Sequence, residues 1–384
     1  MKITSFEYTD YAVEWMLESI NFSSLTLLVG ASGVGKTRIL KAILHLKKIA
    51  RGASLNGVQW KVKFSIDADS YEWSGLFENK GFLSESIFDD SDNEDEKDRP
   101  NIESEKLYIN DAFVIDRTRD GIYFNGAKTV KLSQKESVVS LLKEEDQLKA
   151  VHYGFSKILF DDSAKEEHGL FKLIFNDEET SKKNKYKDLN SIRNSDETIR
   201  SKLYLTYSNA PEQFEEIKNS FIDVFPYVED LKIERIKNSD ERMPRVLREI
   251  PFIQIKEVGI HNWIDERKLS SGMSRTLMHI AELYLCTDGT IILIDEFENS
   301  LGINCIDEIT NSIVTYKREL QFIITSHHPY IINNISLANW KVITRKAGVV
   351  KNYNTTQLNL GKSKHEAFTQ LINHDKYSDG VELL

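Results

Sequence analysis

One glycine-rich stretch of the sequence has the residue types and spacing that bind a chain of phosphates. The stretch fits the pattern G-x-x-x-x-G-K-[ST] in full, with Gly30, Ala31, Ser32, Gly33, Val34, Gly35, Lys36 and Thr37. Glycines let backbone N–H groups turn inward as an anion-binding nest, which the N-terminus of a following helix reinforces. Lys36 would reach the β- and γ-phosphates of ATP, and the Thr37 hydroxyl would coordinate Mg²⁺.

A second group of residues offers carboxylates for the metal and for water. Ile291–Ile294 is a short apolar run typical of a buried parallel strand, and Asp295 and Glu296 follow at its carboxyl end. We expect Asp295 to hold Mg²⁺, directly or through water, and Glu296 to polarise the attacking water as general base. Such an acidic pair is also typical of a helix N-cap region. The phosphate-binding stretch favours the catalytic interpretation.

Two further features belong with these groups. The turn Leu269–Met273 (LSSGM) precedes an amphipathic helix, whose N-terminus is suited to an anion. The apolar run Gln321–Ser326 ends at His327, and an imidazole there could contact the γ-phosphate. The predicted catalytic residues are therefore Lys36, Glu296 and His327.

The elements that must position these residues follow from hydrophobic periodicity. Leu25–Gly30 is an apolar strand that leads through the glycine-rich turn into a helix with apolar residues at helical spacing. Val58–Ile66 alternates strictly, which predicts a half-buried strand. Further strand signals occur at Lys106–Ile115 and around Ile122–Phe124. The dipeptides Asp120-Gly121 and Asn125-Gly126 are typical of hairpin turns. A β-rich subdomain beside the first strand–turn–helix unit is expected.

Composition changes in the middle third of the chain. Residues 137–250 contain long stretches rich in Lys, Glu and Leu, and Phe214–Ile233 is predicted to be a helix that ends before Pro226 and continues as a strand. Alternating apolar runs return afterwards. We therefore divide the chain into an N-terminal lobe (1–136), a helical insertion or arm (137–250) and a C-terminal lobe (251–384).

Overall composition limits the class of protein. Among 384 residues, 50 are Lys or Arg and 60 are Asp or Glu, so the formal charge of −10 excludes a generally basic nucleic-acid coat. Hydrophobic residues make up 40%, enough for a sizeable core. Without a leader or an apolar run long enough to span a bilayer, we expect a cytoplasmic protein with no membrane contact, in which Cys286 and Cys305 are buried thiols. The acidic segment between Phe88 and Glu105 is expected to be a solvated loop, or alternatively an acidic docking segment.

At these motifs the sequence resembles the ABC-type ATPases, and within them the branch of SMC, RecF and OLD-like proteins. Leu269–Met273 resembles the ABC signature LSGGQ, and Ile291–Leu301 resembles the Walker B motif with its D-loop. Thr325–Pro329 (TSHHP) is similar to the T-T-H-S-P switch of the OLD-like group, whose histidine falls on His327. Leu132–Gln134 resembles the Q-loop, which implies a metal or water sensor at Gln134.

The resemblance implies a fold and a mechanism. The fold would be α/β, a P-loop NTPase head of ABC type with an antiparallel β subdomain and a helical arm between the phosphate-binding stretch and the signature. Two protomers would meet head to tail, with Ser270 and Gly272 binding the γ-phosphate in trans and Ser271 between them in the same nucleotide-binding turn. Ser271 and Met273 depart from LSGGQ, which is compatible with slow turnover. Without a long heptad tract, a compact arm is expected rather than a rod.

The leading hypothesis is an ATPase that forms homo-dimers or higher homo-oligomers and regulates a separately encoded effector, such as a nuclease, in antiphage defence. The short segment 328–384 has no clustered acidic nuclease site, so a fused nuclease is not expected. The resemblance therefore points to ATPases that act beside a separate effector, such as the ATPase subunits of Septu-type and retron-associated systems. One alternative is a RecF-like repair ATPase that clamps DNA directly, and another is an ATP-gated scaffold with little turnover. Candidate patches for DNA or RNA, which are equally typical of solvated surface, are Lys182–Lys187, Arg242, Arg245 and Arg248.

Overall fold

The computed structural model describes residues 1–81, 99–161, 185–235, 251–299, 310–311, 313, 318–361, 363–374, 377 and 380. The chain divides into two compact units. The first comprises Met1–Asp161, Asp288–Glu296 and Arg318–Leu384, and the second comprises Asp162–Thr287 and Phe297–Lys317. The mixed α/β fold predicted from the sequence is confirmed.

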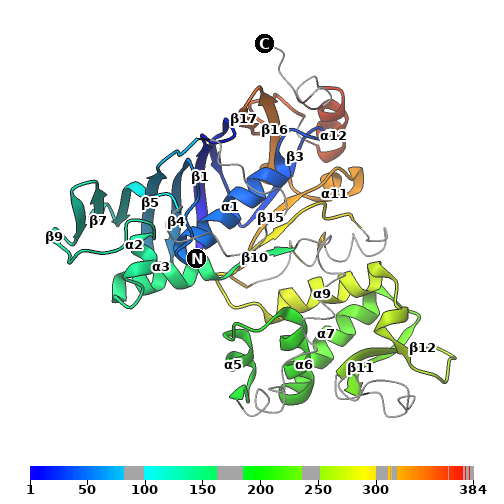
Figure 1. Cartoon of the computed structure of the whole chain (residues 1–384). Coiled ribbons are helices and arrows are strands. Elements are labelled where there is room, and N and C mark those ends of the chain that lie inside the picture. The colour runs from blue at the N-terminus through cyan, green and yellow to red at the C-terminus, as the bar shows by residue number, and fades with distance from the viewer. Residues whose placement is uncertain are drawn as a thin grey trace. The chain divides into compact units, whose positions relative to one another are not determined.

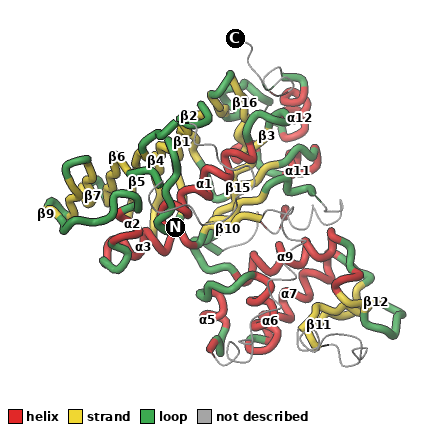
Figure 2. The backbone as a smooth tube through the Cα atoms, viewed as in Figure 1, coloured by secondary structure: helices red, strands yellow, loops and turns green. Residues whose placement is uncertain are grey.

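A large mixed sheet organises the first unit (Figures 1 and 2). Among the described residues it has 14 strands in the order β10-β14-β15-β3-β16-β17-β2-β1-β4-β5-β6-β7-β8-β9. The elements of this unit are β1 (Lys2–Asp10), β2 (Trp15–Asn21), β3 (Leu25–Val29), α1 (Lys36–Ala50), β4 (Val58–Ile66), β5 (Asp69–Phe77), β6 (Ile102–Ile109), β7 (Ala112–Thr118), β8 (Gly121–Phe124), β9 (Ala127–Lys128), α2 (Val138–Leu141), α3 (Asp146–Ser156), β10 (Ile158–Asp161), β14 (Ile291–Ile294), β15 (Gln321–Thr325), α11 (Pro329–Asn334), the 3₁₀ turn η3 (Leu337–Asn339), β16 (Trp340–Lys346), β17 (Val349–Tyr353) and α12 (Lys364–Ile372).

One end of this sheet, from β10 to β16, is parallel. β14 pairs with β15, β15 with β3 and β3 with β16, all in parallel register. Every residue of β3, β14 and β15 is buried, as expected for strands that are covered on both faces and therefore read as continuous apolar runs. The carboxyl ends of the three strands lie at one edge of the sheet.

Helix α1 covers the sheet with one apolar stripe. Ile39, Leu40, Ile43 and Leu46 recur at helical spacing, are fully buried and join the same core as residues of β1, β4 and β15 (Figure 1). This packing fixes the start of α1 close to the carboxyl end of β3, only a short turn away in the chain.

The other end of the sheet, from β2 to β9, is an antiparallel β subdomain. β4 shows the predicted alternation of buried and exposed residues. The predicted strand Lys106–Ile115 is instead a hairpin, because Asn110 and Asp111 form its turn with φ of 49° and 63°, a left-handed conformation that Asn and Asp tolerate better than most residues. Asn125-Gly126 forms the predicted two-residue turn, whereas Gly121 already pairs with Thr118 and lies in β8.

Helices and a small sheet build the second unit. Its elements are α5 (Leu189–Arg193), α6 (Ile199–Asn209), α7 (Pro211–Val224), β11 (Val228–Arg235), β12 (Pro251–Glu257), β13 (Ile264–Asp265), the 3₁₀ turn η2 (Glu266–Lys268) and α9 (Ser271–Leu285). Residues of α6, α7, β11, β12 and α9 share one apolar core. The predicted succession of helix and strand around Pro226 is confirmed by α7 and β11.

The compact units do not follow the divisions at residues 136 and 250. α2, α3 and β10 belong to the first unit, because β10 pairs in parallel with β14. Helix α9 belongs to the second unit, because Met273, Leu277 and Ile280 pack with α7 and β11. The division of this chain into three lobes therefore stays a prediction.

Several predicted features lie outside the described residues. These are residues 89–98 of the acidic segment, Lys182, Lys183, Arg242, Arg245, Arg248 and Cys305. Cys286 is buried. Among the helices that the structure describes, none combines the length and the apolar character needed to cross a bilayer.

A buried charged network holds the antiparallel strands to the segment before α2. The Glu105 carboxylate accepts hydrogen bonds from Trp73 Nε1 (3.0 Å), the Ser137 hydroxyl (2.5 Å) and the Val138 backbone N–H (2.8 Å). Arg117 Nη1 lies 3.7 Å from the carboxylate, and both charged side chains are buried. Burial lowers the pKa of Arg117, which the negative charge of Glu105 counteracts.

Replacing Glu105 should therefore be strongly destabilising. Glu105→Ala leaves the Arg117 charge and several donors buried without their acceptor, so the free energy of unfolding should fall by about 3–5 kcal/mol. Glu103→Ala is the matched control, because Glu103 lies in the same strand as Glu105 but pairs with the largely exposed Arg119. This substitution should lower the free energy of unfolding by less than about 1 kcal/mol. Urea denaturation measures both, and equal losses would contradict this role of the network.

Candidate functional site

The phosphate-binding stretch joins the carboxyl end of β3 to the N-terminus of α1. Gly30, Gly33 and Gly35 have φ of 153°, 81° and 105°, values that L side chains rarely adopt. A Cβ on Gly30 would lie 2.4 Å from the carbonyl oxygen of Ile343, whereas a Cβ on Gly33 would meet nothing within 4 Å. The loop therefore packs tightly against β16 at Gly30 and is open at Gly33.

The N-terminus of α1 is free of competing side chains. No side chain caps it, and its first turn contains no acidic residue. The first N–H groups of a helix have no partner within the helix and carry a partial positive charge. An anion with several oxygens can satisfy them.

Lys36 lies within the loop. It is buried, and its Nζ donates hydrogen bonds to the carbonyl oxygens of Gly30 (2.9 Å) and Ala31 (2.8 Å). These contacts hold the ammonium group against the turn that binds phosphates in loops of this type. Thr37 follows at the start of α1 and is half-buried.

Strand order brings the predicted carboxylates to the same edge. β15 lies between β3 and β14, so the segment after β14 is two strands away from the phosphate-binding loop. Asp295 is half-buried and Glu296 is exposed. The Thr325 hydroxyl at the end of β15 donates to Asp295 Oδ1 and accepts from the backbone N–H of Glu296, each at 2.7 Å.

His327 follows β15 at this edge, as predicted. It is exposed and comes directly after the buried Ser326. The neighbouring His328 is engaged differently, because it caps α11 and its Nδ1 accepts from the backbone N–H of Tyr330 at 3.2 Å.

The signature residues lie in the second unit. Ser270 is exposed and caps α9, with its hydroxyl accepting from the Met273 N–H at 3.2 Å. Ser271 is exposed and Gly272 is half-buried in the first turn of α9. The turn therefore presents the N-terminus of a long helix at the surface of its unit.

Gln134 is not brought to the other site residues. Its carbonyl oxygen accepts from the Ile102 N–H in β6, and the next carbonyl, of Lys135, accepts from the hydroxyl of Ser54. Ser54 follows the C-terminus of α1, whose 15 residues span about 22 Å from the phosphate-binding loop. The structure therefore places the backbone of Gln134 near the end of α1 that is remote from Thr37, and its role as a metal or water sensor stays a prediction.

Two contacts around the loop had no signal in the sequence. Trp15 is buried beside Gly35, and the Arg38 guanidinium lies 4.7 Å from the centre of its ring. A Cβ on Gly380 would lie 2.5 Å from the Cβ of Ala31, and the Gly380 carbonyl accepts from the Arg345 N–H. Both depend on residues distant in sequence, so no local pattern predicts them.

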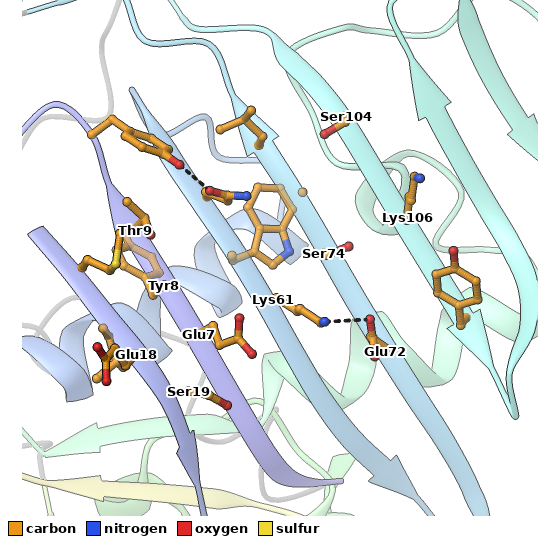
Figure 3. Close-up of a pocket in the computed structure, with 18 residues that line it drawn as sticks. Glu7, Tyr8, Thr9, Glu18, Ser19, Lys61, Glu72, Ser74, Ser104 and Lys106 are labelled. Carbon is orange, nitrogen blue, oxygen red and sulfur yellow. Dashed lines mark hydrogen bonds and ion pairs between the residues drawn. The ribbon is translucent and has the colours of Figure 1, made fainter. Parts of the chain in front are cut away.

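A hollow of about 660 Å³ lies over β2, β1, β4, β5 and β6, with α1 behind the strands in the view of Figure 3. Its side chains carry charges of both signs, and Glu72 pairs with Lys61 at 3.5 Å and with Lys63 at 3.2 Å. None of the predicted site residues lines it. The candidate site is instead formed by the loops at the carboxyl edge of β3, β15 and β14.

A family model described as "AAA domain, putative AbiEii toxin, Type IV TA system" matches residues 25–333, which include the phosphate-binding loop and the acidic strand end. This chain belongs to that AAA family. No curated protein matches the chain.

Solved structures similar to this AAA domain include heads of SMC proteins. An SMC head bound to the C-winged helix domain of ScpA has a TM-score of 0.55 at 14% identity, covering 92% of this chain and 98% of that one. The SMC head domain from Thermotoga maritima also matches, with a TM-score of 0.45 at 12% identity, covering 92% of this chain and 99% of that one. A third match is a Smc head with an extended coiled coil bound to the C-terminal domain of ScpA, derived from Pyrococcus furiosus. It has a TM-score of 0.48 at 14% identity and covers 93% of this chain and 98% of that one. The chain is therefore an AAA domain with the fold of an SMC head.

The residues of the AAA domain fit ATP with Mg²⁺. The open loop at Gly33, the uncapped N-terminus of α1 and the buried Lys36 suit a phosphate chain. Hydroxyl and carboxylate oxygens, as on Thr37 and Asp295, are ligands that Mg²⁺ prefers beside phosphates. When bound, the ion would neutralise charge that develops on the phosphate oxygens.

Lys36→Ala should abolish ATP binding, because it removes the buried ammonium group from the loop. Charged hydrogen bonds contribute about 1.5–3 kcal/mol each, so the dissociation constant should rise by about 100-fold or more. Titration with a fluorescent ATP analogue measures the change. Lys41→Ala, at an exposed position of the same helix, is the control and should bind normally. Retained affinity in the Lys36 variant would contradict the assignment of the loop.

Proposed function

We propose that this chain binds ATP with Mg²⁺, hydrolyses it slowly to ADP and phosphate, and forms head-to-tail dimers whose closing and opening regulate a separately encoded effector, such as a nuclease, in antiphage defence. The observation that carries the proposal is the shared edge of β3, β15 and β14, from which the loops with Lys36, His327 and Asp295–Glu296 extend.

The chemistry follows from the roles of these side chains. Lys36 would hold the β- and γ-phosphates, and the Glu296 carboxylate would accept a proton from water as the water oxygen attacks the γ-phosphorus. The bond between the γ-phosphorus and the β–γ bridging oxygen breaks, and ADP leaves. The exposed His327 would donate a hydrogen bond to a γ-phosphate oxygen.

Dimerisation is proposed because Leu269–Met273 resembles the ABC signature and caps the exposed N-terminus of α9. In the ABC-type arrangement that the sequence resembles, Ser270, Ser271 and Gly272 of one protomer bind the ATP held by the loop of the other. ATP then favours the closed state because it contacts both protomers only there. Hydrolysis removes that preference and reopens the dimer.

The biological role rests on two kinds of support. The family description names a putative AbiEii toxin of a type IV toxin–antitoxin system, and the resemblance to Septu-type and retron-associated ATPases points to defence with a separate effector. The similar SMC head was solved with a domain of ScpA bound, so heads of this fold engage partner proteins. Salt-dependent binding of DNA by the isolated protein would instead favour the DNA-clamp alternative.

Glu296→Gln tests the hydrolytic step. The amide cannot accept the proton, so kcat should fall by about 100- to 1,000-fold while ATP affinity stays within about threefold. Phosphate release and nucleotide titration measure the two quantities. Glu319→Gln is the control, because it removes an exposed carboxylate just before the other end of β15. Equal turnover of wild type and Glu296→Gln would contradict the general base and leave the scaffold alternative.

Ser270→Arg tests the sandwich. A bulky cation at the exposed cap of α9 should prevent closure, so ATP-dependent dimerisation and turnover should be lost while the monomer still binds ATP. Ser363→Arg, at the cap of α12, makes the same substitution elsewhere. Mixing Ser270→Arg with Lys36→Ala rebuilds one complete composite site and should restore part of the turnover. Wild-type activity of Ser270→Arg alone would refute the sandwich, and analytical ultracentrifugation follows the dimer.

A further inference from the structure

One buried hydroxyl contacts both acidic residues of the candidate site. Thr325 is the last residue of β15 and is only 1% exposed. Its Oγ1 donates a hydrogen bond to Asp295 Oδ1 at 2.7 Å and accepts one from the backbone N–H of Glu296 at 2.7 Å. A threonine hydroxyl has one donor and two acceptor positions, so both bonds can exist at once.

Parallel pairing explains why Thr325 reaches these two residues. Ile294 at the end of β14 lies in register with Ile324, so Asp295 and Thr325 are the next residues of the two strands. On its other side β15 pairs with β3, where Thr325 lies in register with Leu28, just before the phosphate-binding loop. Thr325 thus lies at the strand end between the loop and the acidic pair.

Glu296 needs such a contact because its backbone has an unusual conformation. Its φ of 47° is in the left-handed region, which a glutamate rarely adopts unless its surroundings hold it there. Here the surrounding contact is the bond from its N–H to Thr325. This conformation lies in the bend at Asp295–Glu296 that follows β14.

Asp295 is constrained through its side chain. The Thr325 hydroxyl occupies Oδ1, which fixes the carboxylate plane and leaves Oδ2 for another ligand. Partners of this kind orient metal-ligating carboxylates, and their loss typically lowers metal affinity or activity by about 10- to 100-fold.

We propose that Thr325 is a positioning residue of the hydrolytic site, whose single hydroxyl aligns the Mg²⁺-binding carboxylate of Asp295 and fixes the backbone of the general base Glu296. This inference rests on the proposed function. It goes beyond that function by coupling the two roles: metal binding and water activation depend on the same hydroxyl.

The test compares Thr325→Val with Thr325→Ser. Valine has the shape of threonine without the hydroxyl, and serine keeps the hydroxyl. In Thr325→Val we expect kcat to fall by about 10- to 100-fold. The Mg²⁺ concentration for half-maximal binding of a fluorescent ATP analogue should rise by about 10-fold. Nucleotide affinity in EDTA should change by less than about threefold, and Thr325→Ser should retain turnover and the Mg²⁺ midpoint within about threefold.

A matched control separates this role from general packing. Thr344 is buried in β16 of the same sheet, and its hydroxyl has no hydrogen-bond partner among the described residues. Thr344→Val makes the same exchange of atoms and should leave kcat and the Mg²⁺ midpoint unchanged. Thermal melts verify folding, and Thr325→Ala replaces the valine variant should that variant fail to fold.

The outcomes distinguish this proposal from the function on which it rests. A wild-type Mg²⁺ midpoint in Thr325→Val, or equal losses in Thr325→Val and Thr325→Ser, would overturn the positioning role. If the wild-type protein binds Mg²⁺ and nucleotide but does not turn ATP over, the proposed hydrolysis is refuted. The Mg²⁺ titration would still report on Thr325 in that case.

Discussion

The parallel pairing of β14, β15 and β3 is the constraint on which the candidate site depends. Parallel strands end at the same edge of a sheet, so the loops that follow them converge although their residues are far apart in the chain. All three strands are buried along their whole length, which keeps them together in the core of this unit. The apolar runs thus do more than stabilise the sheet, since they align the residues that follow them.

The candidate site also concentrates conformations that most residues avoid. The glycines of the phosphate-binding loop adopt positive φ without a steric penalty, whereas Glu296 adopts φ of 47° with a side chain. Strained backbone persists where neighbours hold it, and here β15 supplies the holding contact through Thr325. Rigidity around the acidic pair suits a site that must place water and metal accurately.

The segment that resembles a Q-loop is held in place by contacts with residues distant in the sequence. Arg117 donates to the carbonyl oxygens of Ser133 (2.9 Å) and Glu136 (2.7 Å), so β7 holds both sides of Gln134. Because the antiparallel strands and the end of α1 determine where this segment lies, its three residues cannot reveal that position. The phosphate-binding stretch, in contrast, contains its own turn, its own lysine and the start of its own helix.

The sequence by itself determined the local parts of this protein. The glycine spacing, the run before Asp295 and the alternation in Val58–Ile66 specify loop, strand ends and half-buried strand, because these patterns depend on neighbours within a few residues. Only the tertiary structure decided the hairpin at Asn110–Asp111, the distance of Gln134 from the loop, and the contacts of Thr325 and Gly380. Those features depend on which strands pair and in what register, and pairing between distant segments is settled by burial of the whole core.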